Sequence, residues 1–168
     1  MLITSDKISV RKNVLSPEEL EPIQEVMLSE EFPWFINKDN PHKFTHIFWK
    51  KMEGPVSPYF PLIIPVLKQT FAKNILQIKA HLFLKTPEII KDRHERSTDV
   101  LSTRCIFSLN DNNGSVSFID NDTEGGIKSI KSEENQMLAF TNPREHGHST
   151  CTNVYGRVVL IFDVHEDD

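Results

Sequence analysis

The second half of the chain places apolar side chains in short runs, which is the pattern of β-strands. Residues 76–84 show it most clearly, because apolar side chains recur there at every second position. Further short runs lie at 103–110, 116–118, 127–130, 137–140 and 158–164. Turn residues bound these runs, and Gly125-Gly126 marks one such turn. Asp111-Asn112-Asn113-Gly114 marks another, and its Asn-Gly step predicts a hairpin between the flanking strands.

The first half predicts short strands and two helices. Residues 8–14 and 43–49 have the composition of strands. Ser16, with Pro17 next and Glu19 three residues on, is typical of a capped helix start. That helix continues through the apolar stripe of Leu20, Ile23, Val26 and Met27. A second helix is expected from Ser57-Pro58 to about Lys73, with Pro65 shortening or kinking its first turns. Its buried face is expected to hold Ile63, Val66, Leu67 and Phe71.

Short strands with turn signals, preceded by helices, predict a mainly β fold with supporting helices, an antiparallel jelly roll. Helical patterns do not separate the later strands, so a parallel sheet is disfavoured. The 168 residues suffice for one domain with a substantial core. We expect a single domain over 1–168, with 1–75 as a helical and strand support region and 76–168 as the jelly-roll core.

Composition narrows the function classes. The net charge is −5, so no global basic field favours nucleic acid, and there is no clear nucleic-acid signal. Apolar runs stay far shorter than the roughly 20 residues of a membrane span, and the first ten residues lack the apolar core of a signal peptide. Cys105 and Cys151 are too few for a disulfide framework. These features predict a cytoplasmic protein without a membrane partner.

Candidate chemistry lies in the polar loop between the last two apolar runs. His146 and His148 stand in that loop, and Arg157 begins the final run. A buried guanidinium needs an anion or a cavity, so Arg157 is expected to point into the mouth of the jelly roll. Val159 and Ile161 should share its strand face. The alternative is a solvated histidine turn and an arginine paired with a surface carboxylate.

Two aromatic blocks occupy the first third of the chain, FPWF at 32–35 and FTHIFW at 44–49. They can fill the core, as aromatic residues commonly do, or form a wall that faces a substrate. His46, within the second block, is expected to be a hydrogen-bonded structural histidine.

These blocks, together with IKAHLF at 78–83, SLNDNNGSVSF at 108–118 and the segment from Asn135 to Val164, resemble phage-type iron(II)/2-oxoglutarate-dependent dioxygenases in order and spacing. The resemblance covers nearly the whole chain and implies a double-stranded β-helix, iron(II), and 2-oxoglutarate as cosubstrate. It implies that His146 is the distal iron ligand and that Arg157 holds the distal carboxylate of 2-oxoglutarate.

The proximal half of the family motif, His-x-Asp, is degenerate here. The region reads DRHERSTD, so His94 has Arg96 at the required offset and Asp99 has Ser97. Either the segment bends so that His94 and Asp99 converge, or the metal site is degraded. The predicted metal ligands are His94, Asp99 and His146, with Glu95 as substitute carboxylate. Arg96 should then turn outward to a carboxylate such as Glu95.

Three functions follow from these observations. The first is an iron(II)- and 2-oxoglutarate-dependent oxygenase that hydroxylates an unidentified substrate and releases succinate and carbon dioxide. The second is a catalytically inactive jelly-roll binding or structural protein derived from that family. The third is a cupin-like module that binds a sugar or another small molecule. Iron content after reconstitution separates the first from the second.

Overall fold

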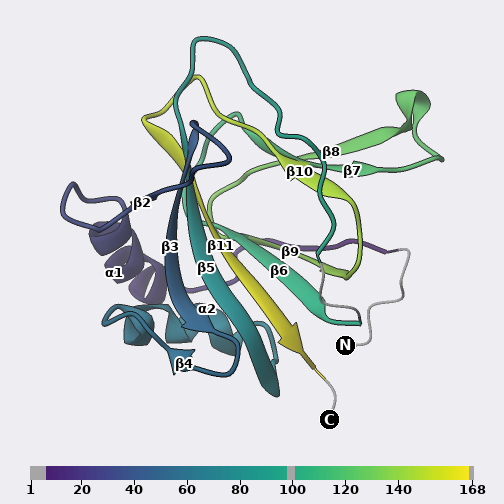
Figure 1. Cartoon of the computed structure of the whole chain (residues 1–168). Helices are drawn as coiled ribbons and strands as arrows, with labels where there is room; N and C mark the ends of the chain where they lie inside the picture. The colour runs from purple at the N-terminus through teal and green to yellow at the C-terminus, as the bar shows by residue number, and fades with distance from the viewer. Residues whose placement is uncertain (1–6, 98–100, 167–168) are drawn as a thin grey trace.

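Two antiparallel sheets form the body of the molecule in a computed structural model that describes residues 7–97 and 101–166 (Figure 1). The first half of the chain contains β1 (Ser9–Arg11), α1 (Pro17–Met27), β2 (Phe35–Ile36), β3 (Lys43–Lys50), β4 (Gly54–Pro55), the 3-10 turn η1 (Phe60–Ile63), α2 (Ile64–Lys68) and β5 (Asn74–Leu84). The second half contains β6 (Thr103–Ser108), β7 (Ser115–Ile119), the 3-10 turn η2 (Glu124–Gly126), β8 (Ile127–Lys131), β9 (Gln136–Thr141), β10 (His146–His148) and β11 (Gly156–His165).

The large sheet has the order β1-β9-β6-β11-β5-β3-β2, with β4 beside β3, and the small sheet has the order β10-β7-β8. Every pairing between these strands is antiparallel, as the lack of crossover helices predicted. The chain passes back and forth between two facing sheets, which is a double-stranded β-helix, or jelly roll. The predicted fold class is therefore confirmed.

β11 lies between β5 and β6 and separates two apolar cores. Val158, Leu160 and Phe162 face the helices, while Val159 and Ile161 face the small sheet. The same alternation puts Arg157 and Asp163 on the face toward the small sheet. The predicted shared face of Arg157, Val159 and Ile161 is confirmed.

The first helix begins as the sequence predicts, and the second is shorter. The hydroxyl of Ser16 accepts a hydrogen bond from the Glu19 N–H, and the Glu19 carboxylate accepts one from the Ser16 N–H, which completes the capping box. The helix predicted from Ser57 to Lys73 is replaced by a 3-10 turn and five helical residues, because Pro65 fits only the first helical turn. Phe71 lies beyond its end with positive φ and is exposed, so its predicted burial is wrong.

The Asn113-Gly114 step does not form the predicted hairpin. β6 pairs with β9 and β11 in the large sheet, whereas β7 pairs with β10 and β8 in the small sheet. The turn therefore carries the chain from one sheet to the other. The segment with His146 and His148 is likewise not a loop but strand β10. Gly125 and Gly126 have positive φ in the turn predicted there.

Three other expectations concern His46, the two cysteines and membrane-spanning helices. His46 is a structural histidine, since its ring nitrogens bond to the Pro33 carbonyl and the Ser57 hydroxyl. Cys105 and Cys151 are free buried thiols. Within residues 7–97 and 101–166, none of the helices combines the length and apolar character that a membrane crossing requires.

Candidate functional site

A pocket of about 530 Å³ opens on the inner face of the large sheet. Its floor comes from β5, β6 and β11, and one wall comes from β10 and the segment at 92–97. The charged and histidine side chains that line it are Asp39, Lys43, Lys79, His81, Asp92, Arg93, Glu95, Arg96, Arg104, His146, His148 and Asp163. Polar side chains therefore dominate the lining of this pocket, in contrast to the two apolar cores of the fold.

Lys79 and His81 reach the pocket because β5 alternates. Ile78 and Ala80 are buried against the helices, so Lys79 and His81 point to the other face. Burial, and then the Arg104 charge, lower the pKa of Lys79 to about 8. Its ammonium has no hydrogen-bond or ion-pair partner among the described residues. Burial lowers the pKa of His81 well below 6.5, with Lys79 as the next cause.

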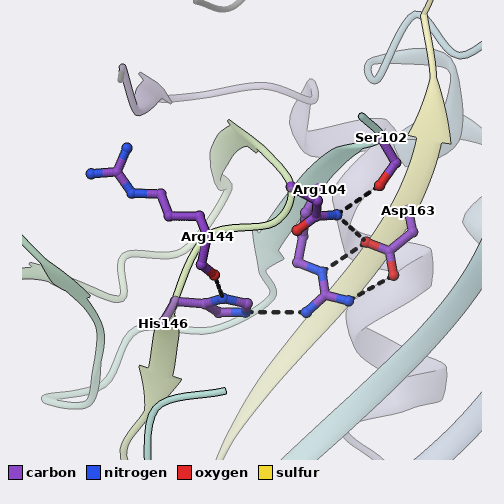
Figure 2. Close-up of polar contacts among 6 residues, drawn as sticks. Ser102, Arg104, Arg144, His146 and Asp163 are labelled. Atoms are coloured by element: carbon purple, nitrogen blue, oxygen red, sulfur yellow. Dashed lines mark hydrogen bonds and ion pairs between the residues drawn. The ribbon is translucent and has the colours of Figure 1, made fainter. Parts of the chain in front are cut away.

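His146 faces the pocket with both ring nitrogens engaged (Figure 2). Nδ1 lies 2.8 Å from the Arg144 carbonyl, which can only accept, so Nδ1 carries the proton. Nε2 is then an acceptor, and Nη1 of Arg104 donates to it at 3.1 Å. Burial and the Arg104 charge lower the pKa of His146 to about 4, which keeps the ring neutral.

Arg104 and Asp163 form the ion pair beneath this histidine. They are opposite each other in the β6–β11 register. Nε and Nη2 of Arg104 donate to Oδ1 and Oδ2 of Asp163, each at 2.7 Å, in a bidentate arrangement. The side chains are 11% and 2% exposed, so the pair is almost enclosed.

His94 does not share the pocket with His146. Glu95 is opposite His146, so these two side chains lie on the inner face. His94 therefore points to the outer face, where Nε2 lies 2.8 Å from the Ser117 hydroxyl. Its ring lies close to Gly147, since a Cβ there would be 2.6 Å from Cδ2 of His94.

The remaining residues of the degenerate motif do not gather at one place. Glu95, the expected substitute carboxylate, lines the pocket near His146. Arg96 turns to Glu145, at 3.5 Å, and not to Glu95. Asp99 lies outside the described residues. The ligand set of His94, Asp99 and His146 therefore stays a prediction, although the structure does not bring its two histidines together.

Arg157 is fully buried behind the pocket. Both terminal nitrogens lie within 3.2–3.3 Å of His148 Nδ1, and the guanidinium lies 5.0 Å from the Phe83 ring centroid. Nε has no hydrogen-bond partner in the part of the chain that the structure describes, and burial lowers the pKa of Arg157 to about 10. Gly114 makes room for it, since a Cβ there would lie 2.6 Å from Arg157 Cδ. His148 thus stands between this cation and the pocket.

The described residues do not by themselves fit an iron(II) ion. They contain no group of three His, Cys, Asp or Glu side chains that could hold a metal. The Nε2 lone pair of His146, which a metal would need, already accepts from Arg104. Sequence reasoning missed Arg104, Asp163 and Lys79, although a charged residue inside an otherwise apolar strand was an available signal in β11.

Comparisons with known proteins identify the fold. The chain matches no protein-family sequence model, and no curated protein sequence matches it either. HygX from Streptomyces hygroscopicus, with nickel and 2-oxoglutarate bound, is 12% identical with a TM-score of 0.61, covering 93% of this chain and 81% of HygX. A 2OG-Fe(II) oxygenase family oxidoreductase from Burkholderia pseudomallei is 10% identical with a TM-score of 0.69, covering 95% and 84%.

A third neighbour is a viral collagen prolyl hydroxylase from Paramecium bursaria Chlorella virus-1 in a 2-oxoglutarate complex. It is 12% identical with a TM-score of 0.60, and the match covers 94% of each chain. The chain therefore has the double-stranded β-helix fold of 2-oxoglutarate/iron(II) oxygenases. The expected 2-oxoglutarate is the molecule bound in HygX and in the viral prolyl hydroxylase, and the expected iron(II) is the metal of the oxygenase family to which the Burkholderia protein belongs.

Proposed function

We propose that the pocket binds 2-oxoglutarate or a closely related small dicarboxylate, in a protein of the 2-oxoglutarate oxygenase type. One observation carries the proposal: Lys79 and Arg157 are cations on the inner side of the large sheet without a carboxylate partner among the described residues. A cation removed from water is costly unless an anion meets it, so a site that keeps two of them suits a dianion.

The choice of 2-oxoglutarate rests on the neighbours. HygX and the viral prolyl hydroxylase share this fold and bind that molecule. In our proposal Lys79 receives one carboxylate within the pocket. Arg157 receives the distal carboxylate after the His148 ring turns aside, because that ring now occupies the guanidinium fork.

Isothermal calorimetry with 2-oxoglutarate tests the proposal, once with excess chelator and once with Mn²⁺. We expect binding by the wild type and at least tenfold weaker binding by Lys79→Met and Arg157→Lys. Lys12→Met is the matched control, since Lys12 pairs with Glu133 on the surface. Glutarate has the same two carboxylates but lacks the keto group, so its affinity shows whether the pocket also recognises the keto oxygen. Absence of binding under both metal conditions contradicts the proposal.

Iron(II)-dependent oxygenation of an unidentified substrate is the second candidate function. It is favoured by the fold of the neighbours and by the placement of His146 and Glu95 on the same inner face. The phage-type subgroup and a cytoplasmic location belong to the same candidate. Release of succinate and carbon dioxide from 2-oxoglutarate, when dioxygen is admitted after anaerobic iron(II) loading, supports it. His146→Ala should lower that release at least tenfold.

A further inference from the structure

Arg104 occupies the place in the pocket that a metal ion would need. Its guanidinium joins β6 to β10, with Asp163 on one side and the Nε2 atom of His146 on the other (Figure 2). A metal bound by a histidine nitrogen lies about 2.0–2.1 Å from it along the lone pair. Nη1 of Arg104 stands on that lone pair at 3.1 Å. The two cations therefore exclude each other at this atom.

Arg104 is also held firmly. Two charge-assisted hydrogen bonds of 2.7 Å fix its fork to a carboxylate that is 2% exposed. Moving the guanidinium out to admit a metal would break both of these bonds and leave the buried Asp163 carboxylate without its ion-pair partner. Within residues 7–97 and 101–166, the other N–H groups of the guanidinium have no acceptor. They border the pocket and remain for a ligand oxygen.

We infer that Arg104 takes the place of the metal ion: the pocket binds its dicarboxylate without a metal, through the Arg104 guanidinium that Asp163 and His146 hold in position. This inference rests on the proposed function and specifies how that site works. The ligand's carboxylate or keto oxygen meets a fixed planar fork instead of an exchangeable metal ion. His146 is then a positioning residue, because its neutral ring accepts from Arg104 and aims it into the pocket.

Calorimetry with 2-oxoglutarate and excess chelator is the experiment. We expect the wild type to bind in chelator, and Mn²⁺ to change the dissociation constant less than twofold. Arg104→Met should weaken binding at least tenfold. Because that change leaves Asp163 buried and unpaired, the double variant Arg104→Met/Asp163→Leu is measured beside it, with thermal unfolding as the check of folding. Arg11→Met is the matched control, since Arg11 bonds to Gln69 outside the pocket.

Each outcome decides a different point. Binding in chelator that the double variant loses and Arg11→Met keeps supports the inference. Binding that appears only with Mn²⁺ overturns it and leaves the proposed function standing. Metal-free binding that survives both Arg104 variants shows that the Arg104–Asp163 pair is only structural and also overturns it. No binding with or without metal removes the proposed function and the inference together.

Discussion

Asp163 and Arg104 form a buried ion pair, so removal of either partner alone is expected to destabilise the fold. Loss of one member of such a pair costs roughly 3–5 kcal/mol, because the other charge stays buried. For Asp163→Leu we expect the low end, about 3 kcal/mol, since Arg104 is 11% exposed and water in the pocket reaches it. For Arg104→Met we expect about 4–5 kcal/mol, since the stranded carboxylate is 2% exposed.

The double variant Arg104→Met/Asp163→Leu removes both charges at once. Replacement of a whole buried pair by apolar side chains is often neutral or stabilising, so its stability should lie within about 1 kcal/mol of the wild type. In a chain of this length 1 kcal/mol shifts Tm by roughly 2–4 °C. Asp163→Leu alone should therefore lower Tm by about 6–12 °C, and the double variant should recover most of that loss.

Urea unfolding of the four proteins in this cycle measures the coupling. Glu133→Ala serves as the surface control: its pair with Lys12 is 3.1 Å long but exposed, so its loss should cost no more than about 1 kcal/mol. If the double variant is destabilised by the sum of the two single losses, the pair is not coupled, and the reasoning about Arg104 is refuted.

Three further predictions address other parts of the structure. Gly147→Ala should cost roughly 1–3 kcal/mol by overpacking, since the new Cβ meets His94 at 2.6 Å and the Asp92 carbonyl at 3.0 Å; urea unfolding checks it, and a neutral result would mean that His94 moves away freely. Affinity for 2-oxoglutarate should fall as pH rises through about 8, where Lys79 loses its proton, and a flat calorimetric profile from pH 7 to 9 contradicts this role. Burial lowers the pKa of His46, so below pH 6.5 this histidine binds a proton more readily in the unfolded chain than in the folded chain. Stability should thus fall as pH drops below 6.5, less steeply in His46→Gln; equal slopes in urea unfolding would disprove the assignment.

Local features of the fold were readable from the sequence because they depend on neighbours along the chain. The capping box at Ser16 and the alternation of β5 and β11 follow from spacing alone. Even the inner face of Arg157 follows from period two. The helix after Ser57 was overestimated because apolar spacing says little about where a proline-interrupted helix ends.

Long-range register decided the rest, and a single sequence does not contain it. The pairing of Glu95 with His146 determines that His94 faces outward, and a shift of one residue would have reversed both. The sequence suggested that Gly114 belongs to a hairpin turn. In the structure, its lack of a side chain leaves space for the Arg157 side chain. Arg104 and Asp163 lie 59 positions apart, and only the β6–β11 register brings them together.

The same register explains how charge is distributed in the site. Arg104 and Asp163 neutralise each other, so the pair contributes a fixed geometry more than a net field. Lys79, which has no ion-pair partner among the described residues, contributes the net positive charge, and its pKa is lowered first by burial and then by the Arg104 charge. An incoming carboxylate would favour the charged form of Lys79, because it adds a direct ion-pair contact, whereas Asp163 and Glu95 act on Lys79 without forming one. In the recognition of a dicarboxylate, Arg104 would thus orient the ligand, and Lys79 would attract it. Salt should then weaken binding mainly through Lys79, because Asp163 already neutralises the Arg104 charge.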